Sequence, residues 1–85
     1  MLYVIVETFK DPAAVYRRFR ERGRLAPDGL NYVSSWVTPD VTRCYQVMEC
    51  ADRRLLDQWL ANWKDIVDCE VVPVITSAQA AEKMK

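Results

Sequence analysis

The order in which strand-like and helix-like patterns follow one another is the strongest constraint on the fold of this chain. Strand patterns, rich in β-branched and aromatic residues, cover Leu2–Thr8, Leu30–Val37, Thr42–Cys50 and Cys69–Ile75. Helix patterns lie between the first and second strands and between the third and fourth. This order predicts two βαβ-like halves that share a central hairpin, which is the ferredoxin-like βαββαβ arrangement of the α+β class.

Residues suited to capping lie at the predicted helix ends. Asp11 precedes a proline and Asp52 precedes a stripe of Leu and Trp, so each aspartate can accept hydrogen bonds from a free first turn. Gly23 provides a left-handed end for the first helix. Ser77 is predicted to cap a short C-terminal helix that runs through Ala81.

Both helices are expected on one face of an antiparallel sheet, because crossover connections are right-handed. With the usual strand order 4-1-3-2, the first and third strands are central and the other two are edges. Pro73 agrees with an edge position for the fourth strand, because proline cannot donate a ladder hydrogen bond, and it could mark a bulge there. We expect one domain over residues 1–85.

Strand alternation predicts which side chains lie on the sheet face that the helices leave open. Leu2, Val4, Val6, Tyr45 and Val47 are expected to pack against the helices. The opposite face is then expected to carry Tyr3, Ile5, Glu7, Tyr32, Ser34, Trp36, Gln46, Met48 and Glu70. Such a face is too apolar for water, so we expect a homodimer whose two sheets enclose a cavity for a small molecule.

Composition argues against several classes of partner. Twelve basic and 12 acidic residues give a net charge of zero, which disfavours nucleic-acid binding. No apolar run is long enough for a membrane-spanning helix, and the N-terminal residues lack the pattern of a signal peptide. Three cysteines without CxxC spacing favour a reducing, cytoplasmic setting without disulfides.

The chain contains no histidine. This absence excludes Ser-His-Asp and Cys-His catalysis and His-ligated zinc, and no Gly-rich phosphate loop or metal-ligand spacing is present, so we expect no cofactor or metal. Acid–base chemistry would fall to Glu7, a carboxylate in an otherwise apolar strand. The alternative is a structural ion pair between Glu7 and Arg43, or an arginine of a second copy.

Four segments of the chain are similar to an uncharacterised bacterial family, a domain of unknown function: VIVETFKDPAAVYRRFRERGR, GLNYVSSWV, RCYQVMEC and NWKDIVDCEVVPVITSAQA. The resemblance implies a subunit of the dimeric α+β barrel type and brings no activity with it. Cys69 stands where similar sequences are expected to have an aromatic residue. The wider superfamily includes small monooxygenases, isomerases and dehalogenase-like enzymes, an analogy at the level of fold.

Two functions stay open at this point. The first is a homodimer that binds a small, partly aromatic or apolar molecule, with Glu7 as the acid–base group of a cofactor-free monooxygenase- or isomerase-like enzyme. In this interpretation Tyr32 and Trp36 hold a flat ligand and Gln46 orients a ligand carbonyl, with Tyr3, Ser34, Met48 and Glu70 completing the lining. The second is a non-catalytic dimerisation or interaction module.

Overall fold

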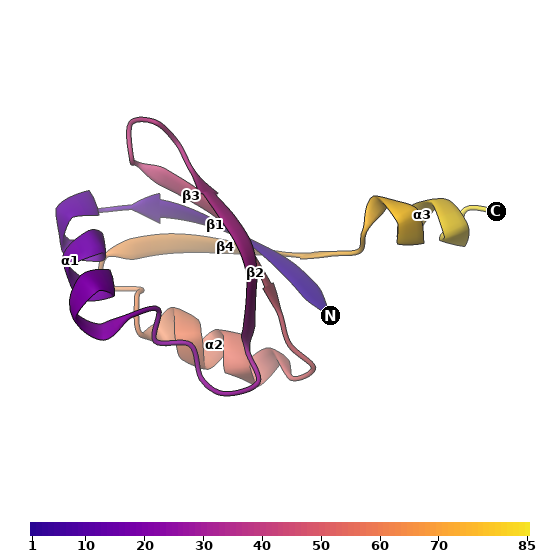
Figure 1. The fold of residues 1–85 in the computed structure, drawn as a ribbon, viewed down its shortest axis with the longest axis horizontal. Coiled ribbons are helices and arrows are strands. Elements are labelled where there is room, and N and C mark those ends of the chain that lie inside the picture. Colours follow the sequence, from indigo (N-terminus) through magenta and orange to yellow (C-terminus); the bar gives the residue numbers. More distant parts are fainter.

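A computed structural model describes residues 1–85 and has seven helices and strands (Figure 1). In chain order they are β1 (Leu2–Phe9), α1 (Pro12–Arg22), β2 (Asn31–Val37), β3 (Arg43–Glu49), α2 (Arg53–Ala61), β4 (Val67–Val74) and α3 (Ser77–Lys83). The predicted element order is confirmed. Most strand ends lie one or two residues away from their expected positions.

The four strands form one antiparallel sheet in the order β2-β3-β1-β4, which is the predicted 4-1-3-2 order read from the other edge. Pro73 lies on the edge strand β4, opposite Tyr3, and the β1–β4 register runs past it without a break. The irregularity of this sheet lies instead in β2, between Tyr32 and Ser34.

The helix caps follow the chemistry of the sequence at three of four predicted positions. The Asp11 carboxylate accepts from the backbone N–H of Ala14 at 3.2 Å, and Asp52 accepts from Arg54 N at 2.9 Å. Gly23 ends α1 with φ of +70°, a conformation that favours glycine.

The cap of α3 was predicted one residue too late. Thr76 accepts from Gln79 N at 3.0 Å, and the Gln79 side chain accepts from Thr76 N at 2.9 Å, so the two residues form a capping box. Ser77 is therefore the first residue inside the helix, which extends to Lys83.

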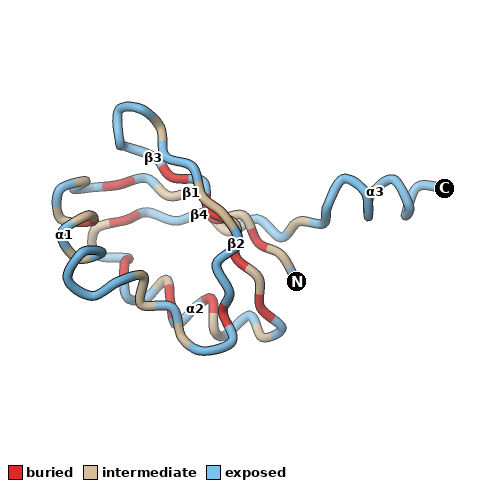
Figure 2. Tube along the Cα trace, in the orientation of Figure 1, coloured by how far each residue is buried: buried red, intermediate tan, exposed pale blue.

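Helices α1 and α2 cover one face of the sheet, whereas α3 projects away from the domain (Figure 1). The core lies between sheet and helices, and its most completely buried side chains include Ile5, Met48, Leu56 and Val67. No residue of α3 is buried (Figure 2). None of the helices combines the length and apolarity needed to cross a bilayer.

The predicted face assignment is wrong for both central strands. Tyr3, Ile5 and Phe9 of β1 are buried under the helices, as are Gln46 and Met48 of β3. Alternation could not separate the two faces because both strands carry apolar residues on each side.

The edge strands follow the prediction more closely. Ser34 and Trp36 lie on the face away from the helices, and so does Glu70, which shares a row with Val6. Tyr32 is the exception, because it pairs with the buried Met48 and therefore lies on the helix side. The irregularity after Tyr32 changes the alternation of β2 by one residue.

We call the uncovered surface of the sheet the open face. Its side chains form rows across the four strands. The side chains of the central rows are mostly apolar: Val4, Val6, Trp36, Tyr45, Val47 and Val72. The Trp36 residue is 61% exposed in the single chain. An apolar surface of this kind is unusual for a protein that stays monomeric.

Candidate functional site

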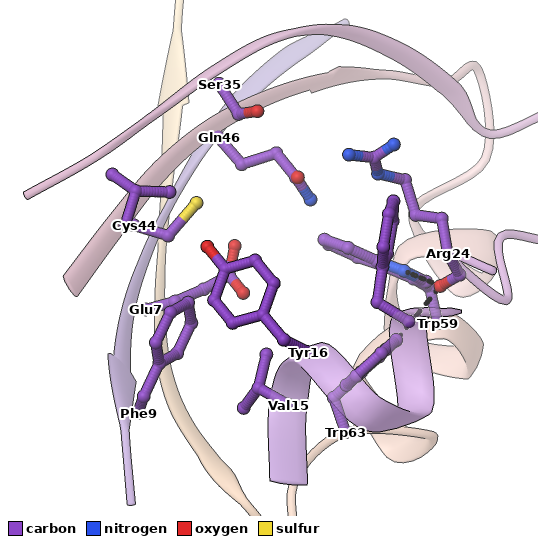
Figure 3. Close-up of a pocket in the computed structure, with 12 residues that line it drawn as sticks. Glu7, Phe9, Val15, Tyr16, Arg24, Ser35, Cys44, Gln46, Trp59 and Trp63 are labelled. Carbon is purple, nitrogen blue, oxygen red and sulfur yellow. Dashed lines mark hydrogen bonds between the residues drawn. The ribbon is translucent and has the colours of Figure 1, made fainter. Parts of the chain in front are cut away.

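A cavity of about 190 Å³ lies between the helix-covered face of the sheet and the two helices (Figure 3). Its apolar wall is formed by Phe9, Val15, Phe19, Val37, Trp59 and Trp63. Its polar groups come from Glu7, Tyr16, Arg24, Ser35, Cys44 and Gln46. A mainly apolar hollow with a few convergent polar groups is the usual form of a small-molecule site.

Glu7 is the carboxylate of this cavity. It lies between Cys44 of β3 and Cys69 of β4 in the sheet register, on the face that the helices cover. One carboxyl oxygen, Oε2, is buried without a hydrogen-bond partner. Burial raises the pKa of Glu7 to about 7, although the neighbouring Cys44 thiol and Arg24 guanidinium both lower it.

The environment of Glu7 keeps the Cys44 thiol protonated. Cys44 is buried, and desolvation together with the nearby Glu7 charge raises the pKa of its thiol to about 12. A thiol in this state is a weak hydrogen-bond donor rather than a nucleophile. Acid–base chemistry in the cavity therefore falls to the carboxyl group of Glu7.

Arg24 lines the cavity from the loop between α1 and β2, and side chains of α2 and of the turn after it hold its backbone in place. The indole N–H groups of Trp59 and Trp63 both donate to the Arg24 carbonyl oxygen, at 2.9 and 3.0 Å. The next residue, Leu25, has φ of +63°, a conformation that costs energy for a residue with a side chain. These long-range bonds stabilise the strained loop in the position that directs Arg24 toward the cavity.

The Arg24 guanidinium stacks on aromatic rings. Its central carbon lies 3.9 Å from the Tyr32 ring centre and 5.3 Å from that of Phe19. It forms neither an ion pair nor a side-chain hydrogen bond within the chain, unlike the guanidinium of Arg18, which bonds Asp65 at 2.7 and 2.8 Å. Its N–H donors are therefore free for another acceptor.

Gln46 and Tyr16 add polar groups to opposite walls of the cavity. Gln46 is 5% exposed, and its amide points into the cavity on the side of Arg24 (Figure 3). Tyr16 comes from α1, and burial, with the charges of Cys44 and Glu7, raises the pKa of its phenol. Ser35 shares a register position with Gln46, and its hydroxyl pairs with that of Tyr32 at 2.7 Å.

The residues that the sequence suggested for the site lie in three different parts of the structure: the cavity, the core and the open face. Glu7 and Gln46 line the cavity, and Tyr32 contributes indirectly by stacking on Arg24. Tyr3 and Met48 lie on the same sheet face but belong to the core. The remaining three, Ser34, Trp36 and Glu70, lie on the open face, so a single cavity bounded by all of these residues does not form.

The cavity that Glu7 lines lies between the sheet and the helices of one chain. The expected cavity between the sheets of two copies stays a prediction. One expectation about Glu7 is wrong. The ion pair between Glu7 and Arg43 does not form, because Arg43 pairs with Thr8 in the register and so lies on the open face.

Sequence reasoning missed Tyr16 and Arg24. Tyr16 belongs to the apolar stripe of α1, which predicts a core position and nothing more. Arg24 ends a run of arginines that suggests a solvated surface, and only its place after the helix-ending Gly23 sets it apart. No group of three metal-ligating side chains comes together in the structure.

Comparisons with known proteins identify the family but not an activity. No curated protein and no solved structure shows significant similarity to this chain. A family model described as a domain of unknown function, DUF3303, matches residues 1–85. The chain therefore belongs to the DUF3303 family.

Proposed function

We propose that this protein binds a small molecule with one apolar ring and a carbonyl group, and that Glu7 moves a proton on it. The observation that carries the proposal is the position of Glu7 in the lining of a cavity with an aromatic wall, together with its buried Oε2, which has no hydrogen-bond partner. A buried polar atom without a partner is costly, so native proteins keep one chiefly where it serves a function.

The size of the cavity limits the ligand. An engineered apolar cavity of about 150 Å³ accommodates benzene. The cavity here, about 190 Å³, is suited to one ring with a short substituent. Larger fused aromatic systems would require the helices to move away from the sheet.

The proposed reaction is a proton transfer next to a carbonyl group. The Glu7 carboxylate removes a proton from the carbon beside the carbonyl, and the electron pair moves to the carbonyl oxygen as an enolate. The Gln46 amide N–H donates to that oxygen. Protonated Glu7 then returns the proton to the same carbon, or, where a β,γ double bond of the substrate makes the anion a dienolate, to the γ carbon, which releases an isomer of the substrate. With a pKa of about 7, Glu7 is present in both forms near neutral pH.

Deuterium exchange tests this chemistry directly. One-ring ketones such as acetophenone and phenylacetone are incubated with the protein in D₂O, and NMR follows exchange at the carbon beside the carbonyl. We expect exchange with the wild type and its loss in Glu7→Gln, with ligand binding retained by thermal shift. Equal exchange in both proteins would contradict the role of Glu7. Oxygen uptake would show that dioxygen, rather than a returning proton, adds to the carbanion.

The open face favours a second function, self-association. Trp36, Tyr45 and Val6 form one row across the sheet and leave a large apolar area uncovered in the single chain. We propose that a second copy of this chain covers it. Two-fold symmetry requires a self-complementary surface, and Arg43 and Glu70, neither of them ion-paired, lie at different borders of the apolar area.

The C-terminal helix supports the same proposal. Helix α3 has seven residues, projects from the domain and buries none of them (Figures 1 and 2). Isolated helices shorter than about 12 residues are marginal in water, so contacts with a second copy would stabilise it. Light scattering at micromolar concentration checks the proposal, and a mass of only 9.9 kDa would contradict it. A dimer that binds none of the ring compounds would be a non-catalytic module.

A further inference from the structure

Arg24 differs from the other arginines of the chain in its surroundings. Arg18, Arg53 and Arg54 each form an ion pair with an aspartate. Arg17 has no such partner, but it is exposed to water on α1. Arg24 alone combines partial burial, a place in the cavity wall and the absence of an acceptor within the chain.

The aromatic contacts of Arg24 define which part of its guanidinium is available. The central carbon of the group lies over the Tyr32 ring, 3.9 Å from its centre, in a cation–π contact that takes up no N–H donor in a hydrogen bond. These donors lie in the plane of the group and point outward, so this contact leaves them free. A planar fork of N–H donors matches a carboxylate, which can accept two parallel hydrogen bonds.

The backbone around Arg24 is built to hold this position. The Arg24 carbonyl oxygen accepts from both Trp59 and Trp63, and the Leu25 carbonyl accepts from Asn62 at 3.3 Å. Three side chains, from the last turn of α2 and the turn that follows it, thus fix two consecutive peptide groups in a segment whose φ is strained. Strained backbone that the surroundings hold in place is typical of functional sites.

We propose that the ligand of this cavity is a small one-ring carboxylate, with its carboxylate bound by Arg24 and its ring against the apolar wall. This inference rests on the proposed function and names its substrate class. Glu7 and Arg24 both line the cavity, so the ligand's reacting carbon can lie near Glu7 while its carboxylate pairs with Arg24. The single arginine and small volume favour a carboxylate over a bulkier, doubly charged phosphate.

Two probes of nearly equal shape test the inference. Benzoate carries the carboxylate and benzamide replaces it with a neutral amide, and calorimetry or NMR titration of the full chain at pH 6.5 gives both dissociation constants. We expect the wild type to bind benzoate at least tenfold more tightly than benzamide. Arg24→Met should abolish this preference with little change for benzamide, and the control Arg17→Met should keep it.

The outcomes separate this inference from the proposed function. Equal binding of the two probes by the wild type, or a preference that persists in Arg24→Met, overturns the carboxylate inference. The proposed binding of a small molecule in the cavity would still stand. Failure of both probes to bind overturns the proposed function as well. If Arg24→Met does not fold, Arg24→Lys decides, because it keeps the charge and loses the planar fork. An undiminished preference in Arg24→Lys would contradict bidentate binding.

Discussion

Glu7 lies directly opposite Cys44 in the β1–β3 register, and both side chains face the cavity under the helices. The pair consists of a carboxyl group that burial tends to keep protonated and a thiol that stays protonated. The Cys44 thiol favours the charged form of Glu7, but desolvation has the larger effect. Glu7 is thereby placed between its two protonation states near neutral pH.

Glu7→Gln should change the pH dependence of stability. The pKa of Glu7 rises from 4.5 to about 7 on folding, so the folded state holds the proton more tightly. The contribution of this proton to the free energy of unfolding is complete below about pH 4.5. It is lost as the pH rises through 7, which lowers the free energy of unfolding by up to about 3 kcal/mol. Glu7→Gln should remove this loss and exceed the wild type in stability at pH 8, as measured by urea unfolding at several pH values.

The other titratable groups around Glu7 do not blur this measurement. The pKa values of Cys44, Cys69 and Tyr16 are raised, so these groups remain neutral up to pH 8. Glu21→Gln, on the exposed side of α1, is the matched control and should leave the pH profile of the wild type unchanged. Identical profiles for Glu7→Gln and the wild type would show that Glu7 is not desolvated.

Cys44→Val should raise the pKa of Glu7 further. The substitution exchanges the thiol for methyl groups and so removes the Cys44 hydrogen bond that lowers the pKa of Glu7. A ¹³C NMR titration of the Glu7 carboxyl carbon measures the effect. Cys50→Val, at a buried cysteine away from the cavity lining, should leave the titration of Glu7 unchanged. A downward shift in Cys44→Val would rule out the proposed role of the thiol.

Trp36→Ala should weaken the proposed dimer while leaving the fold of each chain intact. The ring is 61% exposed in the single chain, so its removal creates no cavity in the core. An exposed tryptophan at the centre of an interface typically contributes about 2 kcal/mol or more to binding. Sedimentation equilibrium measures the dimer constant.

Tyr32→Ala is the control for this substitution. Tyr32 is also an exposed aromatic residue of β2, but its register with Met48 places it on the helix side. It should leave dimerisation unchanged and weaken benzoate binding, because Arg24 loses its stacking partner. Equal dimer constants for the wild type and Trp36→Ala would remove Trp36 from the interface.

Val41→Asn should stabilise the fold. Val41 lies in the turn between β2 and β3 with φ of +59°, a conformation that is costly for a β-branched residue and well tolerated by asparagine. We expect a gain of about 1 kcal/mol in the free energy of unfolding. Val33→Asn, at an exposed valine whose φ is negative, should give no gain in the same urea titration.

The helices and strands and their order could be predicted from local sequence patterns. Capping by Asp11 and Asp52 and the left-handed end at Gly23 depend on neighbours within a few residues. Element order and the handedness of crossovers then leave few topologies open. Glu7 could be singled out as a candidate because a carboxylate is conspicuous in an apolar strand.

The direction and surroundings of the Glu7 side chain depend on contacts between elements that lie far apart in the chain. Strand β1 is apolar on both faces, so alternation was compatible with either orientation until α1 and α2 packed on the side of Ile5. One irregular residue in β2 moved Tyr32 to the helix side. The position of Arg24 in the cavity wall depends on hydrogen bonds that its carbonyl oxygen accepts from Trp59 and Trp63. These residues lie 35 and 39 positions further along the chain. Contacts over such separations depend on how the packed layers meet, and local periodicity carries no information about them.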